Sequence, residues 1–134
     1  MNTMTTIAYF LLRVVAGLLF MHAGGMKLFG WFGGMPGGAT APFMSQVWIG
    51  GVLEVYGGLA IMLGLLTHPV AFILSGEMAV AYWQFHAAKG AWPIVNHGET
   101  AVLFCFIYLY MAARGAGPWS LDALIGRKRR GTSA

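Results

Sequence analysis

Long apolar stretches dominate the chain, and short segments rich in glycine, proline and polar residues separate them. Four such stretches lie at about residues 5–27, 45–66, 69–88 and 99–116. Each comes close to the roughly 17–25 residues that a helix needs to cross the hydrocarbon core of a bilayer. Because unpaired backbone polar groups are very costly in lipid, each stretch is expected to be a helix. The pattern therefore predicts an all-α fold, a transmembrane four-helix bundle.

Glycines mark both the helices and the connections between them. Small residues let membrane helices approach closely, and the candidates for this role are Gly17, Gly50, Gly51, Gly57, Gly58 and Gly64. The segments "GWFGGMPGGATAP" (30–42) and "KGAWPIVNHG" (89–98) break the pattern as loops, whereas little more than "THP" (67–69) joins the second and third stretches. The helices are thus expected to form two hairpins.

Composition supports the membrane interpretation. Hydrophobic residues make up 58% of the 134 residues and charged residues 9%, against roughly 25% charged residues in soluble domains. We expect residues 1–122 to form one transmembrane domain and residues 123–134 to form a basic cytoplasmic tail. The net charge of +4 comes from this tail, which contains "RKRR" at 127–130. Because nucleic-acid binding needs a basic patch on a folded face, no nucleic-acid partner is expected.

The basic tail also predicts the orientation. By the positive-inside rule it lies in the cytoplasm, and an even number of crossings places the N-terminus there too. Both glycine-rich loops then face outward, with Trp31, Phe32 and Trp92 at the level of interfacial aromatic residues. Lys27 and Lys89 lie on that outer face and oppose this orientation, but the four tail charges outweigh them. The expected location is the bacterial inner membrane, crossed several times.

Ionisable residues within the apolar stretches are candidate binding residues, because each is costly in lipid and needs a partner. The candidates are Arg13, His22, Lys27, Glu54, Glu77, His86 and Glu99. Arg13 and Glu77 each lie about 12 Å from the cytoplasmic start of their helix. This equal depth predicts a buried Arg13–Glu77 pair, which acts either as a structural clamp or as a ligand or proton site.

A second group is expected near the outer side. His22 and Glu54 lie roughly 10–14 Å from the outer boundary, whereas His86 and Glu99 lie closer to it. A histidine beside a carboxylate can exchange protons near neutral pH or donate to a quinone carbonyl; a structural hydrogen bond and a protein interface remain alternatives. The helix dipole alone also explains Glu99 at the start of the fourth helix.

Cysteine and histidine spacing limits the chemistry of the chain itself. Cys105 is the one cysteine, so the chain cannot form an internal disulfide, a thiol pair or a cysteine-based metal site. The histidines show no i, i+4 ligand pair, and no metal site is expected. Redox chemistry would need a cofactor that is not covalently bound, and quinone is the candidate. The catalytic residues, if any, are unknown.

Five ordered blocks resemble the DoxX family of small four-helix membrane proteins. They are "RVVAGLLFMHAGGMKLFGWFGG", "GGVLEVYGGLAIMLGLLT", "GEMAVAYWQFHAAKG", "NHGETAVLF" and "GAGPWSLD", and they cover Arg13 to Asp122. Two positions depart from the pattern: Ala23 and His97 stand where the family often has glycine. The resemblance implies an integral membrane protein and, in some members, a link to thiosulfate or quinone oxidoreductase complexes.

Three functions remain open at this stage. The first, implied by the resemblance, is an accessory or anchoring subunit of a quinone- or thiosulfate-linked membrane oxidoreductase system, which is not an enzyme by itself. The second is a small-ligand or proton-coupled binding or transport module that uses the intramembrane Arg, Glu and His residues. The third is a structural membrane scaffold. The expected partners are the lipid bilayer, redox-enzyme subunits and further copies of the chain.

Overall fold

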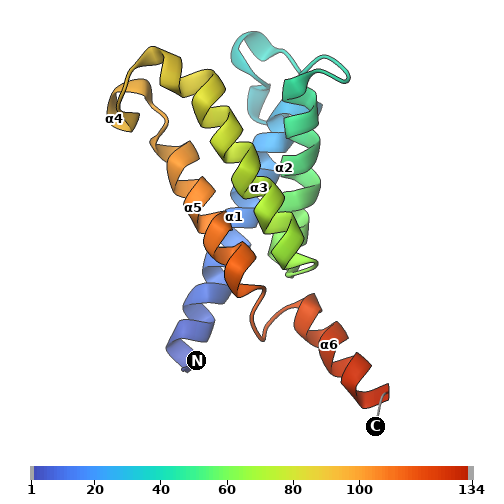
Figure 1. Ribbon diagram of the computed structural model, residues 1–134. Helices are drawn as coiled ribbons and strands as arrows, with labels where there is room; N and C mark the ends of the chain where they lie inside the picture. Colours follow the sequence, from blue (N-terminus) through green and yellow to red (C-terminus); the bar gives the residue numbers. More distant parts are fainter. Residues whose placement is uncertain (1, 133–134) are drawn as a thin grey trace. The chain divides into compact units, whose positions relative to one another are not determined.

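The protein is all-helical, as the sequence predicts. A computed structural model describes residues 2–132, and these contain no strand. The α-helices are α1 (Thr3–Phe29), α2 (Gln46–Leu63), α3 (Thr67–Ala81), α4 (Pro93–Asn96), α5 (Glu99–Arg114) and α6 (Leu121–Thr132) (Figure 1). A π-helical segment at Tyr82–His86 and 3₁₀ turns at Trp31–Gly33, Pro36–Gly38 and Ala87–Lys89 complete the structure.

The chain divides into two compact units, which are described separately. One unit comprises the residues up to Thr67 together with those from Ala116 onward. It contains the α1/α2 hairpin and α6. The other unit, His68–Gly115, contains nearly all of α3, the π-helical segment, α4 and α5.

Local sequence signals define the ends of α1 and α2. The side chain of Asn2 caps α1 by accepting from the amide of Thr5 at 2.8 Å, and Ser45 caps α2 by accepting from the amide of Trp48 at 3.2 Å. Gly30 and Gly64 end the two helices with φ of 74° and 68°, a left-handed conformation that glycine adopts without steric cost.

Glycines hold α1 and α2 close together. A Cβ on Gly24 would lie 2.6 Å from the carbonyl oxygen of Gly51, and one on Gly58 would lie 2.5 Å from that of Gly17. The two glycines on each helix are seven residues apart, so both contacts fall on one stripe of each helix. The small surfaces predicted at Gly17, Gly51 and Gly58 are therefore confirmed, and backbone packs directly against backbone.

Among residues 2–132, two helices are long and apolar enough to cross a membrane. These are α1, with 27 residues, and α2, with 18. In each helix, only 28% of an 18-residue apolar segment is buried. A core helix of a soluble protein would be buried far more completely, and the large apolar side chains exposed here include Leu11, Val15, Leu19 and Leu59. At 1.5 Å per residue, α1 is about 40 Å long, more than the hydrocarbon thickness of about 30 Å.

The remaining predicted stretches form helices with different ends. The third stretch is helical without a break from Thr67 to Lys89, but only its first 15 residues, α3, are α-helical. The fourth stretch, expected at 99–116, is the 16-residue helix α5, which ends at Arg114. Because α3 and α5 are shorter than a full span, four crossings stay a prediction.

The basic tail begins with a folded helix. The predicted boundary between residues 122 and 123 falls inside α6, which begins at Leu121. The hydroxyl of Ser120 caps this helix by accepting from the amide of Ala123 at 3.1 Å. Residues 133 and 134 of the predicted tail lie outside the described residues. The division into a membrane domain and a cytoplasmic tail stays a prediction.

Candidate functional site

Lys27 and Glu54 form an ion pair between α1 and α2. The Nζ atom of Lys27 donates to both carboxylate oxygens of Glu54, at 2.6 and 2.8 Å. The Glu54 side chain is 3% exposed and that of Lys27 is 24% exposed. Among the sequence-predicted site residues, this is a pair that the structure brings into direct contact, and the partner of Glu54 is lysine rather than His22.

The pair forms because the lysine side chain reaches inward. Lys27 lies two residues before the end of α1, about 3 Å along the helix, whereas Glu54 lies about 12 Å from the start of α2. A lysine near the end of a membrane helix usually extends toward the headgroups. Here the close approach at Gly24 and Gly51 brings the helices together, so the ammonium reaches the carboxylate instead.

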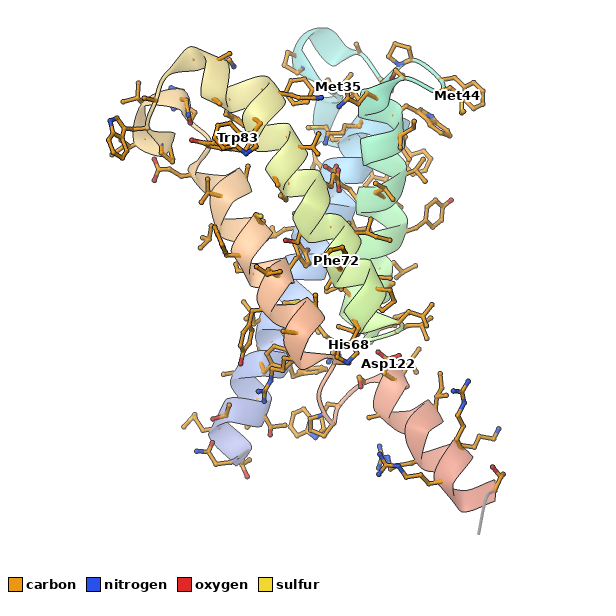
Figure 2. The ribbon with its side chains drawn as sticks, in the orientation of Figure 1. Met35, Met44, His68, Phe72, Trp83 and Asp122 are labelled. Atoms are coloured by element: carbon orange, nitrogen blue, oxygen red, sulfur yellow. The ribbon has the colours of Figure 1, made fainter. Side chains whose placement is uncertain are left out.

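The loop after α1 folds back over this end of the hairpin. The amide of Ala41 donates to the carbonyl of Lys27 at 2.7 Å, and the indole of Trp31 lies against Gly25, where a Cβ would collide with the ring. His22 is half-buried, and its ring meets that of Phe32 edge to face, with centroids 5.2 Å apart. The loop, in which Figure 2 labels Met35 and Met44, thus partly covers the polar end.

This arrangement can present one polar group to a ligand. An ammonium group has three N–H donors, and the carboxylate of Glu54 accepts two of them. The third donor of Lys27, on a side chain that keeps partial exposure, suits a carbonyl or another neutral acceptor. The carboxylate fixes the position of the ammonium and balances its charge, so the site stays electrically neutral.

Arg13 lies near the opposite end of the hairpin and binds backbone carbonyl groups. It is 1% exposed. Its guanidinium donates to Ile61 (2.9 Å) and Met62 (3.4 Å) at the end of α2, and to Ala116 (2.5 Å) and Trp119 (2.8 Å) before α6. The carbonyl end of a helix favours a positive charge. Arg13 therefore clamps α1, α2 and the segment before α6 together.

The aromatic ring of Phe10 supports this clamp. The guanidinium carbon of Arg13 lies 5.4 Å from the centroid of Phe10, and Phe10 contacts the ring of Trp119 edge to face at 5.5 Å. These contacts favour the structural interpretation of Arg13 over a ligand site. Glu77, the predicted partner, belongs to the other unit and is half-buried on α3, so the Arg13–Glu77 pair stays a prediction.

Asp122 is a structural residue that the sequence analysis missed. Its carboxylate accepts from the amides of Leu66 at 2.8 Å and Thr67 at 2.9 Å, and its own amide donates to the carbonyl of Gly64 at 2.9 Å. Figure 2 labels this residue at the start of α6. Asp122 therefore ties the first turn of α6 to the turn that follows α2.

A polar cluster closes the tip of the second unit. Asn96 is fully buried, and its side chain donates to the hydroxyl of Tyr82 and the carbonyl of Gly90, both at 3.1 Å, and accepts from the amide of Gly98 at 2.9 Å. The predicted site residue His86 joins the cluster, with Nδ1 3.2 Å from the carbonyl oxygen of Asn96. Asn96 was not predicted from the sequence, and its role is to fix the loop.

The last candidate, Glu99, has the position that the helix dipole favours. It is exposed and is the first residue of α5.

Within residues 2–132, no group of three or more His, Cys, Asp and Glu side chains is arranged to hold a metal ion. The ion pair of Lys27 and Glu54 at the end of the α1/α2 hairpin is the candidate ligand site.

Comparisons with known proteins agree with the helical membrane architecture. The DoxX family pattern matches residues 8–87. An uncharacterized protein of Haemophilus influenzae is 41% identical over 119 residues, which cover 85% of this chain and 89% of that protein. The inner membrane protein YqjF of Escherichia coli is 29% identical over 138 residues, which cover 96% of this chain and 99% of that protein. No solved structure matches the chain. The family pattern covers more than half of the chain, including most of α1 to α3. The chain is therefore a membrane protein that belongs to the DoxX family.

Proposed function

We propose that the protein is an accessory or anchoring subunit of a quinone- or thiosulfate-linked oxidoreductase system, and that the Lys27–Glu54 pair contacts the quinone headgroup. The observation that carries this proposal is the buried pair itself, with Lys27 oriented by Glu54 and still 24% exposed. Quinone carbonyls are neutral acceptors, and an oriented ammonium is a strong donor to them.

The surroundings suit a flat apolar headgroup. The indole of Trp31 and the ring of Phe32 lie over this end of the hairpin, and aromatic faces pack well against planar rings. His22, against Phe32, is a second donor near the same loop. The chain contributes one cysteine and no internal thiol pair, so the proposal gives the redox reaction to a partner subunit.

The proposed setting is the bacterial inner membrane, with several crossings. α1 and α2 form one hairpin, and the helical run Thr67–Lys89 with α5 forms the second. The Escherichia coli relative is named an inner membrane protein, which supports this location. In this orientation the start of α1 and all of α6 face the cytoplasm, and the loop after α1 faces outward.

The test is purification in a mild detergent, followed by extraction of bound quinone and identification of the co-purifying chains. Lys27→Gln replaces the proposed charged donor with a neutral amide, and Lys89→Gln is the matched control, because Lys89 is exposed in the other unit. We expect the wild type and Lys89→Gln to retain equal amounts of quinone. Lys27→Gln should retain about tenfold less, because a charge-assisted hydrogen bond contributes about 1.5–3 kcal/mol.

The outcomes separate the candidate functions. A wild-type protein without quinone and without a redox subunit contradicts the proposal. If proton-dependent uptake of a solute is lost in Glu54→Gln, the binding or transport module replaces it. If a partner assembles equally well with Lys27 and Glu54 both neutralised and no quinone is found, the protein is a scaffold.

A further inference from the structure

A cavity of about 430 Å³ lies along one face of α6. It is lined by Pro118, Trp119, Asp122, Ala123, Gly126, Arg127 and Arg130. We propose that this cavity binds the phosphate of an anionic phospholipid, while the apolar residues of α6 enter the adjacent bilayer surface. The proposal concerns the end of the hairpin away from Lys27 and does not depend on a role in quinone chemistry.

The charge of the cavity matches a phosphate group. Arg127 and Arg130 are three residues apart, and residues at this spacing are neighbours on a helix. A guanidinium group presents paired donors that fit two phosphate oxygens. Asp122 also lines the cavity, but its carboxylate oxygens accept from the amides of Leu66 and Thr67. With two arginines and one carboxylate, the lining carries a net positive charge.

The structure holds this cavity at the end of the membrane hairpin. Arg13 binds the carbonyl of Trp119, and Asp122 binds the turn after α2. Because α1 and α2 are long and apolar enough to cross a membrane, the residues that are bound to this end of the hairpin lie near the lipid headgroups. Trp119, half exposed at the cavity rim, is of the residue type enriched at that level.

The apolar residues of α6 distinguish a lipid surface from a free anion. Leu124 and Ile125 are 57% and 40% exposed, and neither lines the cavity. An amphipathic basic helix with an exposed apolar face is typical of helices that lie in the interface of an anionic membrane. A soluble phosphate would need the arginines alone, whereas a phospholipid also accounts for Leu124 and Ile125.

The experiment measures lipids bound to the full-length protein by native mass spectrometry, from detergent containing equal amounts of phosphatidylglycerol and phosphatidylcholine. The double variant Arg127→Gln/Arg130→Gln removes the cavity arginines. The double variant Lys128→Gln/Arg129→Gln removes the same charge from positions that do not line the cavity. Glutamine keeps a helix propensity close to those of arginine and lysine, so α6 should remain folded in both; circular dichroism checks this.

We expect the wild type to prefer phosphatidylglycerol and the cavity variant to lose at least about tenfold of that preference, since a charge-assisted hydrogen bond to phosphate contributes about tenfold or more. The control variant should stay within about twofold of the wild type, because a contact at the cavity is local. Equal losses in the two variants would mean diffuse attraction and overturn the proposal, as would a wild type without preference.

A third arm distinguishes the source of the phosphate. We expect Leu124→Ser/Ile125→Ser to weaken phosphatidylglycerol binding, and an excess of inorganic phosphate to leave it in place. If inorganic phosphate displaces the lipid and the serine variant binds like the wild type, the cavity takes a free anion, and the lipid proposal is wrong.

Discussion

The ammonium of Lys27 lies 2.6 and 2.8 Å from the two carboxylate oxygens of Glu54, across the interface of α1 and α2. Glu54 is almost completely buried, so its charge depends on this partner. Breaking a buried pair by removing one member leaves an uncompensated charge, which is more costly than removing both. The pair is therefore a constraint on the hairpin as well as a candidate ligand site.

Glu54→Gln should destabilise the protein more than the double variant Lys27→Met/Glu54→Gln. The reason is that Lys27 remains charged in the single variant and loses its charged partner, since the glutamine amide offers one neutral acceptor oxygen. We expect a coupling energy of about 1–3 kcal/mol in a double-mutant cycle, measured from unfolding in detergent. Additive effects of the two single substitutions would show that the ion pair does not stabilise the hairpin.

Arg13→Met should destabilise the protein by at least about 3 kcal/mol, because four backbone carbonyls lose a charged donor. Arg114→Met is the control, since Arg114 is exposed on α5 and exposed substitutions usually stay within about 0.5 kcal/mol. Thermal unfolding measures stability, and hydrogen exchange should show faster exchange in residues 116–122 only in Arg13→Met. Unchanged exchange there would contradict the clamp.

Gly58→Ala should separate α1 from α2 and cost about 2 kcal/mol or more, because the added Cβ would lie 2.5 Å from the carbonyl oxygen of Gly17 and 2.8 Å from the amide nitrogen of Met21. Gly76→Ala on α3 is the matched control, because an added Cβ there meets nothing within 4 Å. Alanine should stabilise that helix by about 0.5–1 kcal/mol. A stabilising Gly58→Ala would refute the backbone contact.

Asp122→Ala should cost about 1–2 kcal/mol, the range for losing a helix cap, since the amides of Leu66 and Thr67 lose their acceptor. Asp122→Asn keeps one acceptor oxygen and should cost less. Hydrogen exchange at the Leu66 and Thr67 amides reports on the contact directly. The same exchange rates in Asp122→Ala as in the wild type would show that the contact is not maintained.

The sequence predicted the features that depend on the size, polarity or charge of a residue itself. Apolar length located α1 and α2 to within a few residues. The presence of Gly17, Gly51 and Gly58 in apolar stretches indicated close helix packing, because a glycine leaves the helix surface open to a neighbouring backbone. The cost of charge in lipid also indicated that Arg13 and Glu54 would be buried with partners.

The identity of those partners could not be predicted. Arg13 binds carbonyl groups of the backbone, which every residue carries, so no sequence pattern marks Ile61 or Ala116 as its acceptors. Equal depth suggested His22 as a neighbour of Glu54, but the flexible side chain of Lys27 spans the difference in depth. Asn96 and Asp122 act on backbone groups of loops, whose conformations follow from tertiary contacts rather than from periodicity.

The most direct measurement of the membrane architecture is labelling of single cysteines with an impermeant maleimide in intact cells. Cys105→Ser supplies the background, and Thr40→Cys in the loop after α1 and Thr132→Cys at the end of α6 are the two probes; both positions are exposed. The account predicts labelling at position 40 in intact cells and at position 132 only after lysis. Labelling of both positions from the same side would contradict a spanning α1/α2 hairpin, and the reverse pattern would contradict its orientation.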